Sequence, residues 1–161
     1  MFYTNYESPV GKLLLAATER GLAGVYFENH RHFKGSDGWV LDDGNAILSV
    51  VKSQLDEYFG GRRQQFDVPL DMSSGTAFQQ QVWQALLDIP FGVTASYGEL
   101  ARRIGKPAAV RAVGAANGRN PVSIIVPCHR VIAGSGALTG YAGGLMNKQT
   151  LLTLEAANQV I

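Results

Sequence analysis

Short apolar runs separated by turn residues mark the first 30 residues. The runs cover residues 2–6, 12–18 and 22–27, and the breaks between them are Ser8-Pro9-Val10-Gly11 and Glu19-Arg20-Gly21. Gly, Pro and Ser between short runs of this kind are typical of turns that join antiparallel strands. The pattern predicts an N-terminal antiparallel sheet.

A helical period follows the polar stretch 29–44. Apolar side chains recur every three or four residues up to Gly60-Gly61, at Ile47, Val50, Val51, Leu55 and Phe59. This spacing predicts one amphipathic helix packed on the sheet. Residues 66–70 are a candidate last strand, and residues 71–75 have the composition of a linker. We therefore divide the chain into a supporting α/β domain, 1–75, and a second domain, 76–161.

The second domain reads as mostly helical. Thr76 with Gln79, and Ser96 with Glu99, have the spacing of capping boxes ahead of helices that end near Pro90 and Gly105. A further helix is expected from Pro107 toward Gly118, which makes a helix-turn-helix candidate with the helix before it. Residues 122–126 predict a buried strand leading to Cys128, and the last helix is expected over about 147–157. The fold class is α+β.

Composition and charge narrow the function classes. The 161 residues are 46% hydrophobic and 17% charged, as in ordinary globular proteins. No apolar run is long enough to span a membrane and no leader pattern is present, so a cytoplasmic or nuclear protein is expected. Residues 1–75 hold seven cations and ten anions, a net −3, whereas residues 76–161 hold seven cations and three anions, a net +4. No acid lies between Glu99 and Glu155, which favours a polyanionic partner for the second half.

The helix expected after Pro107 has an unusual surface. Arg111 is flanked three and four positions away only by small residues, Ala108, Gly114, Ala115 and Pro107. Such a helix fits either close approach to DNA with one inserted side chain or tight packing against another helix.

Cys128 is the only cysteine, so no intramolecular disulfide can form. A lone cysteine is most often a small buried hydrophobic residue, but Pro127-Cys128-His129-Arg130 places this one in an electropositive setting that favours a thiolate. Because neighbours in a chain need not point the same way, Cys128 and His129 are not a dyad on this evidence. His30 and His32 are expected to be surface histidines, and no metal site is predicted.

Five sequence elements in order resemble the O6-alkylguanine-DNA alkyltransferase family. They are Ser96-Tyr97, Arg111-Ala112-Val113-Gly114, Arg119-Asn120-Pro121, Pro127-Cys128-His129-Arg130-Val131 and Tyr141-Ala142-Gly143-Gly144. The resemblance covers residues 76–156, and the first 75 residues resemble that family's ribonuclease-H-like N-terminal domain only in layout. It implies a helix-turn-helix, winged-helix-like second domain and DNA repair by one irreversible transfer of an alkyl group from guanine O6 to the protein's own cysteine. O4-alkylthymine is left open as a second substrate.

The resemblance also implies roles for individual residues. Cys128 would be the nucleophile, activated through a water by His129, which Glu155 holds, while Asn120 ties the turn beside it. Tyr97 would assist both rotation of the nucleotide and departure of the guanine. Arg111 would enter the base stack from the minor groove, with further DNA contacts from Ala112, Ala115 and Arg119. The pocket would be lined by Val131, Tyr141, Ala142 and Gly143, with the Ala142 amide facing O6.

The expected partner is therefore double-stranded DNA containing O6-alkylguanine, bound by a monomer without cofactor, metal or membrane. The alternative is a non-catalytic helix-turn-helix protein that recognises alkylated DNA. A cysteine hydrolase is a further class, but it requires a distant His and an oxyanion hole.

Overall fold

An antiparallel meander forms the N-terminal sheet, as the short apolar runs and the turns between them predict. In a computed structural model, which describes residues 1–159, β1 (Phe2–Ser8), β2 (Gly11–Ala17) and β3 (Leu22–Phe27) pair antiparallel in sequence order. A short strand that the sequence analysis missed, β4 (Val40–Leu41), adds parallel to β1, so the strand order is β3-β2-β1-β4. Both β4 residues are exposed, which explains why no apolar pattern marked it.

Helix α1 (Ala46–Phe59) packs on this sheet and begins where Asn45 caps it. Its buried stripe is Leu48, Val51, Leu55 and Tyr58, whereas Val50 is 46% exposed, so the prediction of Val50 as a core position was wrong. The predicted strand over 66–70 is also absent. Only Leu70 makes an isolated bridge, to Leu22, and the rest of that segment crosses to the second half without a strand partner.

The second half is mostly helical, with α2 (Ala77–Leu86), α3 (Tyr97–Arg103), α4 (Val110–Gly118) and α5 (Leu145–Ala157). Thr76 and Gln79 form the full reciprocal capping box of α2, with bonds of 2.9 and 3.1 Å. Ser96 caps α3 through the Glu99 amide at 3.1 Å. Helix α4 starts at Val110 and not in the Pro107 turn, because residues 106–109 close a separate turn. Helices α3 and α4 pack together as the helix-turn-helix pair.

The segment before Cys128 is not the predicted strand. Residues 123–125 turn, and Ile124 has a φ of 72°, in the left-handed region that a strand does not use. The Val25 amide donates to the Pro121 carbonyl at 2.8 Å, and Val122 bridges to Val25, so the segment lies beside β3. Cys128 opens a short 3₁₀ helix, η1 (Cys128–Arg130), and β6 (Val131–Ile132) pairs in parallel with β5 (Ala95–Ser96).

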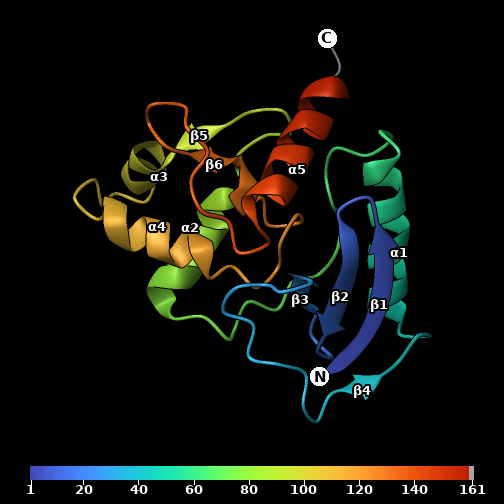
Figure 1. Cartoon of the computed structure of the whole chain (residues 1–161). Helices are drawn as coiled ribbons and strands as arrows, with labels where there is room; N and C mark the ends of the chain where they lie inside the picture. The colour runs from blue at the N-terminus through green and yellow to red at the C-terminus, as the bar shows by residue number, and fades with distance from the viewer. Residues whose placement is uncertain (160–161) are drawn as a thin grey trace.

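The two halves share one apolar core. It joins side chains of the sheet and α1, such as Leu15, Val25 and Leu55, to side chains of the second half, such as Val126 and Leu151. Figure 1 shows the sheet and α1 on one side of the molecule, α2, α3 and α4 on the other, and α5 against the centre. None of the helices in residues 1–159 is long and apolar enough to cross a membrane.

Candidate active site

Cys128 is buried at the junction of the two halves. Its residue is 4% exposed, and its amide donates to the Val126 carbonyl at 2.8 Å. Burial raises the pKa of the Cys128 thiol, while the neighbouring Asn120 amide and Lys148 ammonium act in the opposite direction. The net direction is upward, contrary to the expectation from the charged sequence neighbours, because desolvation outweighs them.

His129, the next residue in the chain, forms a fully buried pair with Glu155. Nε2 of His129 lies 2.7 Å from Oε2 of Glu155, and Nδ1 of His129 has no hydrogen-bond partner within the described chain. Burial lowers the pKa of His129 despite the carboxylate. For Glu155 burial would raise the pKa, but the hydrogen bonds and charges of His129 and Arg130 together hold it below its ordinary value. A neutral imidazole with a free Nδ1 can accept a proton.

Two further residues hold Glu155 that the sequence analysis did not assign. Arg130 donates from Nε to Oε1 at 2.8 Å and from Nη2 to Oε2 at 3.0 Å, and its third donor, Nη1, meets the Ile89 carbonyl at 2.7 Å. The Tyr58 hydroxyl of α1 donates to Oε2 at 2.6 Å. Tyr58 lies three residues after Leu55 on the buried stripe of α1, and a buried tyrosine hydroxyl needs a partner, so a signal was present.

Lys148 is the third residue that the sequence analysis missed. It is fully buried on α5, and its Nζ donates to the carbonyls of Val131 at 2.7 Å and Thr139 at 3.1 Å. Its spacing from Leu151 and Glu155 places all three on one helix face, which marks Lys148 as buried. It ties the loop 133–144 to the strand that follows η1.

Asn120 closes the turn that precedes Cys128. Its Nδ2 donates to the carbonyls of Val126 at 2.9 Å and Val122 at 3.3 Å, and its Oδ1 accepts from the Val122 amide at 3.0 Å. This buried side chain fixes the irregular segment whose end delivers the thiol.

A hollow of about 370 Å³ lies between α4 and the loop 133–144. Its walls come from three parts of the chain, and the lining residues are Arg31, His32, Tyr97, Gly114, Ala115, Gly118, Thr139, Gly140, Tyr141 and Ala142. The Tyr97 and Thr139 hydroxyls meet at 2.6 Å across it. None of the hydrogen bonds found in residues 1–159 uses the Ala142 amide, which leaves a donor for a ligand atom in the hollow.

The remaining predicted residues lie around this hollow. Arg111, Ala112 and Arg119 are exposed on α4 and at its end. The Val131 carbonyl faces Lys148 Nζ, as described above. Gly143 packs directly on β3, since a Cβ there would lie 2.3 Å from Cδ2 of Phe27.

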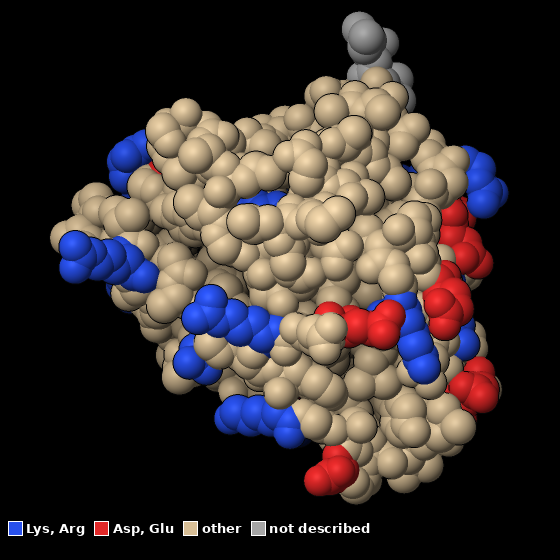
Figure 2. Space-filling view, viewed as in Figure 1, with Lys and Arg blue, Asp and Glu red and all other residues tan. Residues whose placement is uncertain are grey.

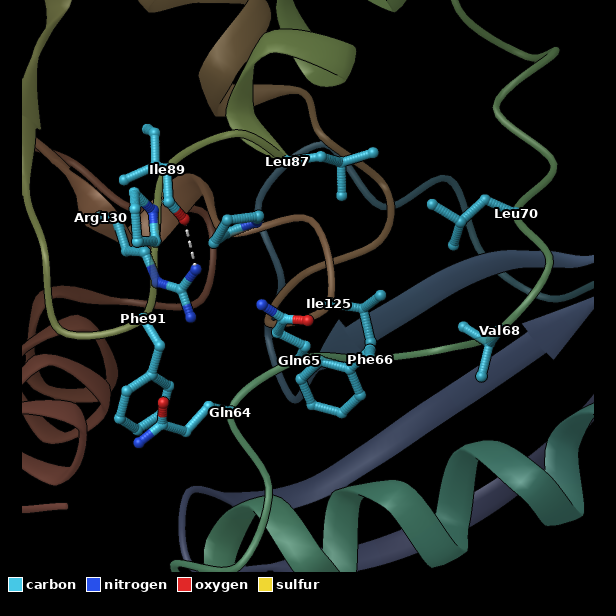
Figure 3. A pocket seen from close by; sticks show the side chains of 12 residues that line it. Gln64, Gln65, Phe66, Val68, Leu70, Leu87, Ile89, Phe91, Ile125 and Arg130 are labelled. Carbon is cyan, nitrogen blue, oxygen red and sulfur yellow. Dashed lines mark hydrogen bonds between the residues drawn. The ribbon is translucent and has the colours of Figure 1, made fainter. Parts of the chain in front are cut away.

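A larger hollow, of about 520 Å³, lies elsewhere, and Cys128 is among the lining residues of neither hollow. Figure 3 shows its lining, which comes from residues 64–70, the segment after α2, Ile125 and Arg130. All the guanidinium nitrogens of Arg130 are already engaged by Glu155 and Ile89, so this hollow offers no free charge to orient a substrate.

His30 is buried, which corrects the expectation of a surface residue. Its Nδ1 accepts a hydrogen bond from the Phe27 amide at 3.2 Å, closing the turn after β3. His32 is exposed, as expected. No group of three or more His, Cys, Asp or Glu side chains that could hold a metal ion occurs in the part of the chain that the structure describes.

Comparison with known proteins matches both halves of the chain. The model of the "6-O-methylguanine DNA methyltransferase, DNA binding domain" matches residues 77–157, and that of the "6-O-methylguanine DNA methyltransferase, ribonuclease-like domain" matches residues 1–72. The chain belongs to the 6-O-methylguanine DNA methyltransferase family. These two matches confirm the resemblance and the α+β fold expected from the sequence.

Relatives of this methyltransferase family match along almost the whole chain. The methylated-DNA--protein-cysteine methyltransferase of Methanosarcina acetivorans is 49% identical over 98% of this chain and 99% of its own length. That of Mycobacterium leprae is 52% identical over 92% of this chain and 88% of its own. A crystal structure of Mycobacterium tuberculosis OGT in complex with DNA matches with a TM-score of 0.91 and 48% identity, covering 98% of this chain and 94% of that one. These full-length matches do not favour the alternative of a non-catalytic DNA-binding protein.

Proposed function

We propose that this chain removes the alkyl group from O6 of guanine in double-stranded DNA and keeps it on Sγ of Cys128, one group per molecule. As a member of its family it is a DNA-repair methyltransferase whose partner is DNA. The observation that carries the assignment of residues is that Cys128 is buried and directly precedes His129, whose imidazole is hydrogen-bonded to Glu155.

The transfer balances without a cofactor. The Sγ proton leaves through a water to Nδ1 of His129, the sulfur lone pair forms the new S–C bond, and the C–O6 bond breaks with its electron pair staying on guanine. Guanine then takes up one proton overall, so that thiol and O6-alkylguanine become thioether and guanine. Glu155 stabilises the imidazolium that forms in passing, as a carboxylate does for a general base.

The pocket residues supply position and leaving-group stabilisation. The unused Ala142 amide is a donor for O6, and the Tyr97 hydroxyl can exchange Thr139 for a guanine ring nitrogen. We assign the Val131 carbonyl, with one lone pair free beyond Lys148, to the guanine amine. Tyr141 forms the wall beside the sulfur, and Gly143 allows the loop to reach this position.

Magnitudes indicate that geometry dominates the rate. Complete ionisation of a thiol with an ordinary pKa of about 8.5 is worth at most about 30-fold at pH 7. In-line positioning of sulfur and carbon can supply about 7–11 kcal/mol. We therefore expect pocket distortions to slow transfer more than loss of the base does.

The lesion must leave the duplex to reach a buried sulfur. Extrusion costs a few kcal/mol, and the exposed Arg111 on a helix face of Ala and Gly is suited to fill the vacated place from the minor groove. Ala112, Ala115 and Arg119 are the neighbouring contacts in this proposal. The same proposal includes a monomer that acts on one lesion and a cytoplasmic or nuclear location. It also includes a domain boundary after residue 75, which the family matches to 1–72 and 77–157 support.

Intact mass spectrometry after incubation with a duplex carrying one O6-methylguanine tests the proposal. We expect one added methyl group, mapped to Cys128, and unmodified guanine in the DNA. The Cys128→Ser variant should still bind the duplex but gain no mass. Loss of the lesion while Cys128 stays a free thiol would refute the assignment.

A further inference from the structure

The N-terminal half contributes to the rim of the hollow between α4 and the loop 133–144. Arg31 and His32, in the loop after β3, line it together with Tyr97 and Ala142 of the second half. The loop is attached there, because the Arg31 amide donates to the Ala142 carbonyl at 2.9 Å. The N-terminal half thus holds Ala142, whose amide is unused, through a hydrogen bond to its carbonyl.

The same loop lines a second hollow, of about 340 Å³, that continues on the other side of Arg31 and His32. The two hollows together are bordered by three cationic side chains, Arg31, Lys34 and Arg119, and by no Asp or Glu. Within residues 1–159 none of these three cations forms a salt bridge. Besides burial, the nearby Arg119 and Arg31 lower the pKa of His32, as expected where positive potential accumulates.

The cationic strip formed by Arg31, Lys34 and Arg119 continues along the surface of the molecule. Figure 2 shows Lys and Arg side chains gathered on the side formed by α3, α4 and the loop after β3, whereas most Asp and Glu side chains on this face lie toward α1. The net −3 of residues 1–75 therefore conceals a cationic segment that faces the same way as α4.

The loop is held in one shape before any ligand binds. His30 closes the turn by accepting from the Phe27 amide, and the Tyr26 and Phe33 rings pack with centroids 4.4 Å apart. His32 has a φ of 65°, a left-handed conformation that costs free energy in a non-glycine residue and persists only where the surroundings impose it. A cationic loop ordered in advance loses little entropy on binding.

We propose that Arg31 and His32 bind the DNA phosphates next to the extruded nucleotide, so that the N-terminal half forms part of the DNA interface. This inference rests on the proposed function, since a nucleotide that enters the hollow between Tyr97 and Ala142 carries its flanking phosphates to the rim. Exposed guanidinium and imidazole groups there have no carboxylate partner and match phosphate oxygens. Arg119 closes the same strip from the end of α4.

Binding of an undamaged duplex, measured by fluorescence anisotropy from 50 to 200 mM salt, tests this interface. Arg31→Gln should weaken binding about three- to tenfold and reduce the slope of log K against log salt by about one, since one phosphate contact is lost. His32→Asn, which tolerates the left-handed backbone, should weaken binding at pH 6 more than at pH 8. Arg62→Gln removes the same charge from the same half, at the end of α1, and is the matched control.

Two results would overturn the inference. One is an unchanged salt slope in Arg31→Gln, which would leave an acidic protein surface as the partner of the loop. The other is an equal loss of reaction with the duplex and with free O6-benzylguanine, which would mean that the substitution acts through the Ala142 loop. Failure of Cys128 to become alkylated in the unmodified protein would refute the proposed reaction instead, and the salt slopes on undamaged DNA would stand independently.

Discussion

The Tyr58 hydroxyl of α1 lies 2.6 Å from Oε2 of Glu155 on α5, across 97 residues of sequence. The same carboxylate oxygen accepts from His129, so one atom joins the His129–Glu155 pair to the helix that packs on the N-terminal sheet. Burial and the carboxylate raise the pKa of Tyr58, which keeps the hydroxyl protonated and donating.

Replacing Tyr58 with Phe should destabilise the protein by about 1.5–3 kcal/mol, the usual worth of a buried hydrogen bond to a charged group. The matched control is Tyr6→Phe, which removes a hydroxyl bonded to the Asp56 carboxylate at the surface and should cost less than about 1 kcal/mol. Urea unfolding of both variants measures the difference. Equal losses would mean that Glu155 does not depend on α1.

Removing the Arg111 side chain should slow reaction with duplex DNA much more than reaction with a free modified base. Because only a duplex requires extrusion of the base, Arg111→Ala should slow repair of duplex O6-methylguanine by about 100-fold, equivalent to about 2.7 kcal/mol, and leave reaction with free O6-benzylguanine within about twofold. Rapid-quench rates on both substrates measure this. An equal fold-decrease in rate with both substrates would contradict the role of Arg111 as the inserted side chain.

Lys148→Met keeps the buried stem and removes the charge. We expect the pKa of Cys128 to rise further, because the nearby ammonium lowers it, and the loop 133–144 to loosen, because two carbonyls lose their donor. The rate of iodoacetamide modification against pH reports the thiol, and limited proteolysis reports the loop. Lys148→Arg, which retains a cation, should restore the thiol profile at least in part; a wild-type profile in Lys148→Met would contradict the coupling.

Mild acid should destabilise the fold through buried histidines. Burial, with a smaller effect of His32, lowers the pKa of His30 to about 4, so the unfolded chain binds a proton near pH 6.5 that the folded chain does not. Stability should therefore fall as the pH is lowered from 7 to 5, by on the order of 1–2 kcal/mol from His30.

His129, whose pKa burial also lowers, contributes in the same direction. His30→Asn retains a side-chain acceptor for the Phe27 amide and should flatten this pH dependence. Urea midpoints at pH 5, 6 and 7 provide the measurement, and an equally steep dependence in the variant would assign it to other groups.

Local signals predicted most of the fold. Capping residues such as Thr76 and periodic stripes such as that ending at Tyr58 act within one helix, so the sequence displays them directly. The prediction of a strand over 122–126 was wrong because the apolar side chains of this run are buried by contacts with β3 and not by pairing in a sheet. Strand β4 was not predicted because its residues are exposed and it forms only where the folded chain brings them beside β1.

The site was predicted to a similar extent. Resemblance supplied Cys128, His129 and Glu155; the structure buries all three and pairs His129 with Glu155, while their roles stay predictions. Tyr58 and the Arg31 loop belong to the other half of the chain, and only the folded arrangement places them at the site. The raised pKa of Cys128 likewise depends on three-dimensional burial, which charged sequence neighbours do not reveal.

The contact of Gly143 with Phe27 ties the loop 133–144 to the sheet. The ring leaves no room for a side chain at position 143, and it also meets the Tyr141 ring edge to face, with centroids 5.6 Å apart. The Phe27 ring thus limits how closely residues 141–143 approach β3, and a smaller residue at position 27 would let this part of the loop move toward the sheet. Under the proposed function, the range of alkyl groups that the loop admits would depend on a β3 residue that is not part of the hollow's lining.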